Sequence, residues 1–278
     1  MKSIRLPQDL VPTLSEQIII YDYLSTQEVS KQQVSLSQNT FSFLIEGTKE
    51  VVHNNANVAI DSSKFILMQA GHCLMTERLS TINNYRSILL FFTNEAILNF
   101  LIKNNIPYNN IANHNSVHTF NYDDFIRRFA FSLLDINKLN NPTKNKLLTL
   151  KLEEILLYLI ELYSVDFLLS FTINNNNQIQ KFTQTIESNI LNKLTLNELA
   201  FLCNMSLSSF KREFKKHYAE SPSRWFQSKR LEYAHTLLSQ KNKTVSEIYL
   251  EIGYESASSF IQAYKAKYGT TPTQHRKK

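Results

Sequence analysis

Two stretches near the carboxyl end of this chain carry the same pattern of polar and apolar residues. Ser206–Lys215 (SLSSFKREFK) returns fifty positions later as Ser256–Lys265 (SASSFIQAYK). Arg and Lys donate to guanine, Gln pairs with adenine through two hydrogen bonds, Ser bonds to several base edges, and an apolar side chain contacts the thymine methyl group. If each stretch is a helix that presents its polar side chains, it has the chemistry needed to read base pairs in double-stranded DNA.

Helical geometry of about 100° per residue sorts each stretch into two faces. The aromatic positions, Phe210 and Phe214 in the first copy and Phe260 and Tyr264 in the second, fall on one face, which we expect to be buried. Residues expected to point outward are Ser208, Lys211, Arg212 and Lys215, and then Ser258, Ile261, Gln262 and Lys265. Each of them alone is equally compatible with an ordinary solvated surface, and it is the coincidence of two homologous faces that favours base reading.

Each copy follows a shorter helical pattern, over 196–200 in the first and 245–248 in the second. Asn204 and Gly253, which tolerate the left-handed conformation, lie in the intervening turns. Ser, Thr, Asn and Asp are the favoured N-cap residues, and here the candidates are Thr195, Ser206, Thr244 and Ser256. The sequence therefore predicts the helix-turn-helix pattern twice.

A single helix from Pro222 to about Ser239 is predicted between the two units, with Ser221 as its N-cap. About 18 residues span about 27 Å, enough with side offsets to place two recognition helices about one DNA turn, roughly 34 Å, apart. Cations near these helices are candidates for phosphate contacts, although solubilising surface charge is an equal alternative for each. They are Lys215, Lys216, Lys229, Arg230 and Lys265.

The distribution of charge supports an anionic partner for the second half of the chain. Residues 1–174 contain 14 Lys and Arg against 16 Asp and Glu, whereas residues 175–278 contain 16 Lys and Arg against 8 Glu and no Asp. A basic region of this size favours nucleic acid or an anionic membrane surface. The longest apolar runs, such as Ile88–Phe92, are too short to span a membrane, and the amino terminus does not resemble a secretory signal, so we expect a cytoplasmic protein.

Enzyme chemistry is not indicated by the sequence. Four glycines, each explicable as a turn or cap, exclude a glycine-rich nucleotide loop, and no nucleophile with a base is evident. Cys73 and Cys203 have neither metal-ligand nor disulfide spacing and are expected to be reduced thiols. His53 and His72 stand alone, and residues 114–118 (HNSVH) form a polar stretch expected to lie outside the strands. We therefore predict no catalytic residues, no metal and no cofactor.

The first half of the chain is predicted to contain strands and then helices. Short strand patterns between residues 16 and 93 favour a small antiparallel barrel or sandwich, and helical patterns follow from Asn94, over Asp123–Lys138 and over Thr143–Tyr163. The last helix carries a seam with the spacing of a coiled coil, together with further apolar residues. We predict that this seam forms a dimer contact, with burial inside its own domain as the alternative: Leu148, Leu152, Ile155, Leu159 and Leu162.

Residues 178–277 resemble the DNA-binding domain of the AraC/XylS family of bacterial transcription regulators. The resemblance is carried by Gly253-Tyr254-Glu255-Ser256, Phe260, Tyr264-Lys265, Tyr268-Gly269, Thr271-Pro272 and Arg276. It implies an all-α domain with two helix-turn-helix units joined by a long helix, and activation through contacts with RNA polymerase. By motif position, the base-reading residues are Ser208, Lys211 and Arg212, then Ala257, Ser258, Ile261 and Gln262. Asn204, Gln262 and His275 depart from the family's usual Gly, Arg and Tyr.

Residues 1–173 resemble more weakly the family's companion domain, a cupin-like antiparallel β-barrel with dimerisation helices, and 178–278 form the DNA-binding domain. The α+β chain is therefore predicted to be a homodimeric, sequence-specific activator of transcription, with double-stranded DNA and RNA polymerase as partners and no membrane partner. Its first domain would bind a small-molecule or protein effector. The alternative is an architectural DNA-binding protein that senses nothing.

Overall fold

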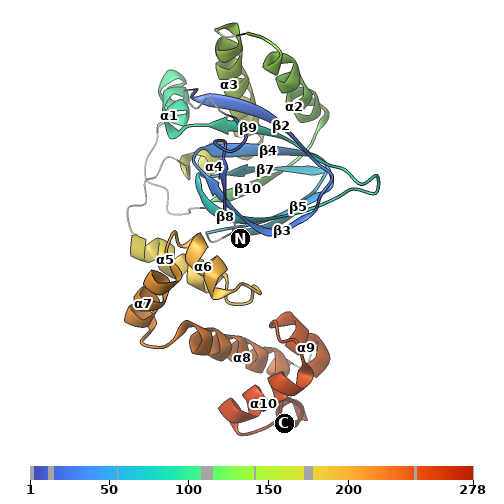
Figure 1. The fold of residues 1–278 in the computed structure, drawn as a ribbon, viewed down its shortest axis with the longest axis vertical. Helices are drawn as coiled ribbons and strands as arrows, with labels where there is room; N and C mark the ends of the chain where they lie inside the picture. Colours follow the sequence, from blue (N-terminus) through green and yellow to red (C-terminus); the bar gives the residue numbers. More distant parts are fainter. Residues whose placement is uncertain are drawn as a thin grey trace. The chain divides into compact units, whose positions relative to one another are not determined.

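The computed structural model describes residues 3–11, 16–54, 56–107, 115–140, 142–171, 178–240 and 243–277. The chain divides into two compact units, 1–178 and 179–278, each with its own hydrophobic clusters. Strands are confined to the first unit, and the described residues of the second form helices and turns (Figure 1). The predicted α+β class, with antiparallel sheets first and a helical domain second, is confirmed.

Two five-stranded sheets form the first unit. Their strand orders are β1-β3-β8-β5-β6 and β10-β7-β4-β9-β2, and every pairing is antiparallel except β1 with β3. The strands are β1 (Ile4–Leu6), β2 (Ile18–Ser25), β3 (Val29–Leu36), β4 (Asn39–Glu46), β5 (Thr48–His53), β6 (Ala56–Asp61), β7 (Lys64–Met68), β8 (Gly71–Arg78), β9 (Tyr85–Phe92) and β10 (Val117–Asn121).

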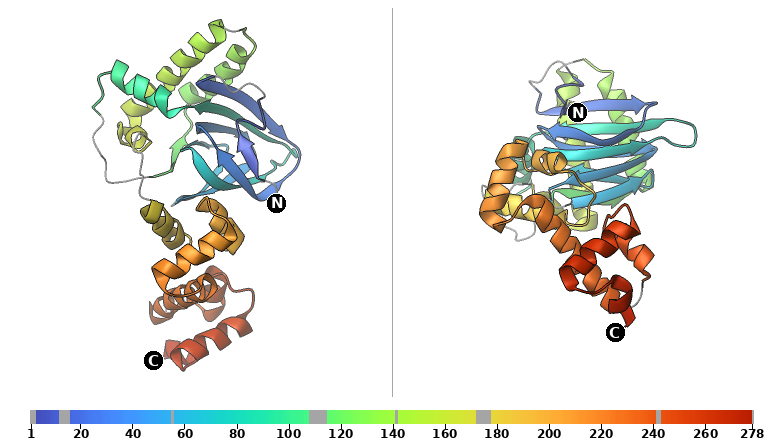
Figure 2. Two further views of the ribbon diagram at one scale, coloured as in Figure 1. Left: turned by 60° about the vertical axis from the view of Figure 1, so that its left-hand side comes forward. Right: turned by 60° about the horizontal axis from the view of Figure 1, so that its bottom comes forward.

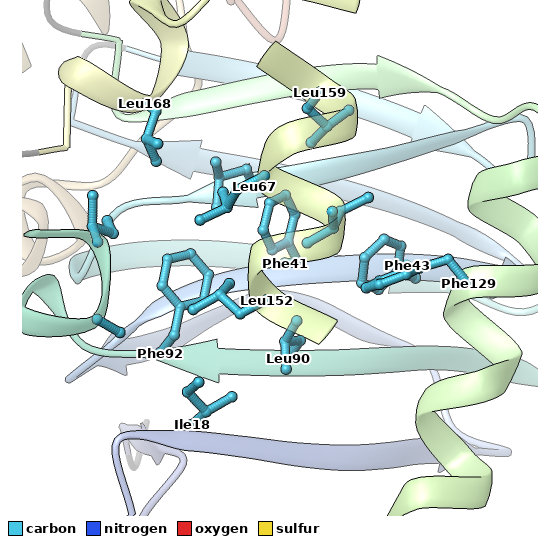
Figure 3. Packing of buried hydrophobic residues seen from close by; sticks show 14 of the residues in the cluster. Ile18, Phe41, Phe43, Leu67, Leu90, Phe92, Phe129, Leu152, Leu159 and Leu168 are labelled. Atoms are coloured by element: carbon cyan, nitrogen blue, oxygen red, sulfur yellow. The ribbon is translucent and has the colours of Figure 1, made fainter. Parts of the chain in front are cut away.

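The second sheet is buried on both faces. In β4, Phe41 and Phe43 belong to the cluster shared with the helices, whereas Leu44 belongs to the cluster between the two sheets. A strand covered on both sides has no solvent-facing side, and this explains why β7 and β9 are mostly apolar and why Thr40 and Ser42 of β4 are buried. The two sheets therefore enclose an interior, and the second sheet also supports a helical layer (Figure 3).

Four helices cover the outer face of the second sheet (Figures 1 and 2). They are α1 (Asn94–Lys103), α2 (Asp124–Asn137), α3 (Thr143–Tyr163) and α4 (Asp166–Leu169). The sequence predicts the bounds of α3 correctly, and α2 begins where the Asp123 side chain accepts a hydrogen bond from the backbone N–H of Ile126 at 2.8 Å. Strands precede helices as predicted, except that β10 lies between α1 and α2.

The seam of α3 does not have the predicted role. Leu148, Leu152, Ile155 and Leu159 are each at most 2% exposed and pack in the first unit's own core, and only Leu162, at 51%, is exposed. Figure 3 shows Leu152 and Leu159 lying between α3 and the second sheet. The prediction that this seam contacts a second subunit is wrong for these four residues, because the sheet already covers them.

The segment after residue 113 differs from the prediction. Residues 117 and 118, expected outside the strands, lie in β10, where His118 pairs with Leu67 of β7. That prediction is wrong because β10 is an edge strand too short and too polar to show alternation. The predicted linker Asn174–Asn177 and residue His114 lie outside the described residues.

The second unit contains seven helices in its described residues. They are α5 (Gln178–Ser188), α6 (Leu196–Leu202), α7 (Leu207–Tyr218), α8 (Pro222–Gln240), α9 (Val245–Glu251), α10 (Ala257–Tyr268) and α11 (Pro272–Lys277). The long helix α8 is shared between two cores. Trp225 and Phe226, near its start, pack with α5, α6 and α7, whereas Leu231, Ala234 and Leu238 pack with α9 and α10.

Candidate DNA-binding surface

The first helix of each helix-turn-helix unit begins with a capping box. The hydroxyl of Thr195 accepts from the N–H of Glu198 at 3.2 Å, and the Glu198 carboxylate accepts from the N–H of Thr195 at 2.6 Å. Thr244 and Glu247 repeat both bonds at 3.2 and 2.7 Å. Each box satisfies two N–H groups that the helix would otherwise leave unpaired, so both helices start where the sequence predicts.

The two turns have the same backbone geometry. Asn204 and Gly253 adopt φ values of 54° and 84°, the left-handed region predicted for both. The N–H of the next residue, Met205 or Tyr254, then donates to a carbonyl of the preceding helix at 2.9 Å in each unit. The second turn holds one residue more, Glu255, before the cap of its recognition helix. The two units are therefore true structural repeats that differ by one residue in the turn.

The recognition helices α7 and α10 bury their aromatic face and expose their polar one. Phe210, Phe214, Phe260 and Tyr264 are fully buried, so the predicted inward face is confirmed. Of the predicted outward residues, Ile261 is half-buried and the others are exposed: Ser208, Lys211, Arg212, Lys215, Ser258, Gln262 and Lys265. Ala257, a base-reading position by motif alone, is also half-buried. Each helix thus presents a row of side chains able to donate to or accept from bases and phosphates.

The cations of this surface differ in whether a carboxylate of the protein already forms an ion pair with them. Among the described residues, Lys211, Arg212, Lys215 and Lys265 take part in no ion pair. Lys216 and Lys229, in contrast, reach carboxylates within their own helices, at 3.3 Å from Glu213 and 2.8 Å from Glu232. A phosphate would compete with those carboxylates, so the four unpaired cations are the better candidates for DNA contacts.

Arg230, predicted as a phosphate contact, has a structural role that sequence reasoning missed. Its Nε donates to the carbonyl of Ile190 and its Nη2 to that of Asn192, both at 2.8 Å. Burial lowers the pKa of this guanidinium. The side chain therefore ties the segment between α5 and α6 to the middle of α8. No local pattern reveals this, because the partners lie about forty positions away and are backbone atoms.

Recognition helix α10 is fastened to α8 by Lys267. Its ammonium donates to the carbonyl and hydroxyl of Ser228, at 2.8 and 2.6 Å, and to the carboxylate of Glu232 at 3.0 Å. Hydrogen bonds from Lys229 and Lys267 lower the pKa of Glu232 to about 2. A second link joins His235 Nδ1 to the hydroxyl of Tyr264 at 2.8 Å. The orientation of α10 is thus fixed by polar contacts as well as by its aromatic core.

Other chemistry finds little support in the part of the chain that the structure describes. No group of three or more His, Cys, Asp and Glu side chains there could hold a metal ion. Cys73 and Cys203 are free thiols, and burial raises the pKa of each to about 12, which disfavours the reactive thiolate. Within the same residues, no helix is long and apolar enough to cross a membrane.

A chain with two such units joined by one helix is a double helix-turn-helix protein of the DNA-binding class. A family model described as a helix-turn-helix domain matches residues 199–278, and one described as the ExsA N-terminal regulatory domain matches 39–171. With matches in both halves, the chain belongs to the AraC/XylS family of transcription regulators, a family of non-enzymatic proteins.

Individual relatives match over shorter ranges. The HTH-type transcriptional regulator ExsA of Pseudomonas aeruginosa is 31% identical over 102 residues, 37% of each chain. The thermoregulatory protein LcrF of Yersinia pestis is 33% identical over 128 residues, 46% of this chain and 47% of that one. The chain thus matches less than half the length of these curated relatives. A solved structure of ToxT from Vibrio cholerae has a TM-score of 0.41 and 12% identity, covering 94% of this chain and 98% of that one.

Proposed function

We propose that this protein is a sequence-specific activator of transcription that reads two successive major grooves with α7 and α10. The observation that carries the proposal is the pair of repeated recognition helices, each with a buried aromatic face and an exposed row of Ser, Lys, Arg or Gln. Base reading falls to Ser208, Lys211 and Arg212 in α7 and to Ala257, Ser258, Ile261 and Gln262 in α10. Lys215 and Lys265 lead the phosphate contacts, followed by Lys216 and Lys229, whereas Arg230, a phosphate candidate by sequence, is assigned a structural role because its guanidinium is bonded to the carbonyls of Ile190 and Asn192.

Selection of bound DNA from a random pool by the full chain, at about 0.15 M salt, tests this proposal. We expect an asymmetric motif with two blocks about one DNA turn apart. Absence of any enrichment by the full chain, and by residues 178–278 in a second selection, would refute sequence-specific reading. Weak binding without sequence preference would favour the architectural alternative.

Single substitutions then distinguish residues that read bases from residues that contact phosphates. Arg212→Ala and Gln262→Ala should each weaken binding to the selected motif by about 1–3 kcal/mol and relax preference at particular bases. Lys215→Gln, one turn along α7, is the matched control: it should weaken binding to all sequences alike and reduce the salt slope by about 1. Equal loss on every sequence for all three variants would contradict this division of roles.

The first unit is proposed to dimerise and to bind an effector, either a small molecule or a regulatory protein. Leu150 and Leu157, seven positions apart on one face of α3, are 56% and 48% exposed, whereas Leu162, 51% exposed, lies about 120–140° around the helix from them. Exposed apolar residues in one region favour a protein interface. Sedimentation of the Leu150→Glu/Leu157→Glu double variant tests this: a dimer that persists unchanged would exclude this face of α3.

RNA polymerase is the proposed partner on the promoter, and the cytoplasm is the proposed location. In-vitro transcription from the selected motif, with and without the protein, tests the first. Increased transcript identifies an activator, whereas reduced transcript at the same occupancy would make the protein a repressor.

A further inference from the structure

A cavity of about 80 Å³ lies inside the first unit, between the two sheets. One buried water needs about 10–15 Å³ of such volume, so the cavity has room for about five to eight non-hydrogen atoms. Most of its walls are aliphatic, including Leu6, Val34, Leu36, Met75 and Leu89. A small molecule with an apolar body fits these walls.

An ion pair also faces this cavity. Lys49 of β5 and Glu77 of β8 are direct partners in the ladder, and their Nζ and Oε1 atoms are 3.3 Å apart. The two side chains are only 3% and 7% exposed. Lys49 Nζ also donates to the hydroxyl of Ser42 at 3.1 Å. Both charged groups therefore lie on the inward face of the first sheet.

Stability alone does not account for this pair. Removing two charges from water costs several kcal/mol per ion in real proteins, and replacing a buried pair by apolar residues is often neutral or stabilising. Further polar groups gather here. Tyr23 lines the cavity, and burial together with the nearby Glu77 charge raises its pKa. Tyr85 lies behind the cavity wall: its buried ring is 5.8 Å from Lys49 Nζ, and burial together with the Glu77 charge raises the pKa of its hydroxyl. Convergent polar groups in an apolar cavity are typical of a ligand site.

The pair also limits the charge of the ligand. Because the charges of Lys49 and Glu77 cancel, a charged ligand would leave a net charge buried in an apolar interior, which is costly. We propose that the cavity binds a small, electrically neutral, mostly aliphatic molecule whose polar end both donates and accepts hydrogen bonds, as a primary amide or an alcohol does. Such a group accepts from the ammonium of Lys49 and donates to the carboxylate of Glu77. This inference rests on the proposed effector-binding role of the first unit.

Three probes of equal chain length test the ligand class on the full-length protein. Pentanamide is neutral, pentanoate is an anion and pentylammonium is a cation, and their affinities are compared by titration calorimetry at pH 7. We expect pentanamide to bind at least 10-fold more tightly than either ion. Leu36→Trp, which places a larger side chain in the cavity wall, should abolish binding of all three probes. Pentanoate binding as tightly as pentanamide, or no binding of any probe, would overturn the proposal.

Charge variants give a test that does not depend on the natural ligand. Glu77→Gln leaves the Lys49 charge unpaired, so pentanoate should become the best of the three probes, a reversal of at least 10-fold. Lys49→Met leaves Glu77 and should favour pentylammonium. If a single variant does not fold, the Lys49→Met/Glu77→Leu double variant replaces the pair by apolar groups and should melt as the wild type does while binding pentanamide at least 10-fold more weakly, because the polar end of the probe then has no hydrogen-bond partner. Unchanged preferences in folded single variants, or unchanged pentanamide affinity in the double variant, would refute the role of the pair.

The same preparations are used for DNA selection, so the two proposals can fail separately. An enriched DNA motif with no probe binding removes the cavity proposal alone. Loss of the DNA motif while pentanamide still binds removes the proposed function and leaves a small-molecule site in the first unit.

Discussion

Arg230 has a structural role in this structure, whereas the sequence predicts that it contacts DNA, and a single substitution distinguishes the two roles. Its guanidinium makes two hydrogen bonds of 2.8 Å to the carbonyls of Ile190 and Asn192. A hydrogen bond to a charged group contributes about 1.5–3 kcal/mol, and the side chain is half-buried, so we take the lower part of that range for each bond. Replacement by Met keeps the apolar stem and removes both bonds. We therefore expect Arg230→Met to lower the free energy of unfolding of the second unit by about 3–4 kcal/mol.

The assay pairs denaturant unfolding with the salt dependence of DNA binding. Lys229→Met is the matched control, since its neighbouring ammonium pairs with Glu232 in solvent and should contribute less than about 1 kcal/mol. For the Arg230 variant we expect an unchanged salt slope at temperatures where it is folded, because one phosphate contact would account for about 0.9 of that slope. A loss of stability under about 0.5 kcal/mol, together with a slope reduced by about 1, would refute the structural role and restore the phosphate contact.

Three further predictions concern stability. The residues that end α7 and α10 both adopt the left-handed conformation, Ala219 at φ 55° and Gly269 at φ 74°. Because glycine adopts this conformation without strain, Ala219→Gly should stabilise the protein by about 0.5–1 kcal/mol and Gly269→Ala should destabilise it by about 1 kcal/mol. Changes in melting temperature of the opposite signs would contradict this reasoning. The pKa of Glu232 is lowered from 4.5 to about 2, so its stabilising contribution is complete above pH 4.5 and is lost as pH falls toward 2. The Glu232→Gln variant should lose less stability than the wild type between pH 4.5 and 2. The same dependence of stability on pH in both proteins would exclude this contribution of Glu232. Leu152→Ala should cost about 2–5 kcal/mol, against within about 0.5 for Leu150→Ala, and equal effects in urea unfolding would place the α3 core elsewhere.

The second unit follows from local sequence signals because each signal acts within a few residues. Thr195 and Thr244 cap helices that begin beside them, and Asn204 and Gly253 adopt the left-handed conformation at their own positions. Periodicity likewise identifies Phe210 and its equivalents as buried. At these positions the sequence predicts the local structure, and the physical cause lies in the same few residues.

Long-range contacts are what the sequence does not reveal. The seam of α3 shows that one face is apolar, but periodicity does not say whether a sheet or another subunit covers it, and here Leu152 packs on the sheet. The sequence predicts Arg230 as a phosphate contact or a solvated cation and does not single out Lys267, because the partners of both lie 35 to 40 positions away. The Lys49–Glu77 pair escapes notice for the same reason, since only strand pairing brings β5 beside β8.

The division of α8 between two cores has a consequence for the way such a protein can change during evolution. One added residue in the middle of this helix would advance one core by about 1.5 Å and rotate it by about 100° relative to the other. One added base pair, in contrast, advances the duplex by about 3.4 Å and rotates it by only about 34–36°. The pitch of the polypeptide helix and that of the double helix do not match, so no single insertion in one is compensated by a single insertion in the other. New target sequences are therefore expected to arise by substitution on α7 and α10, while the distance between the two blocks of the target stays constant.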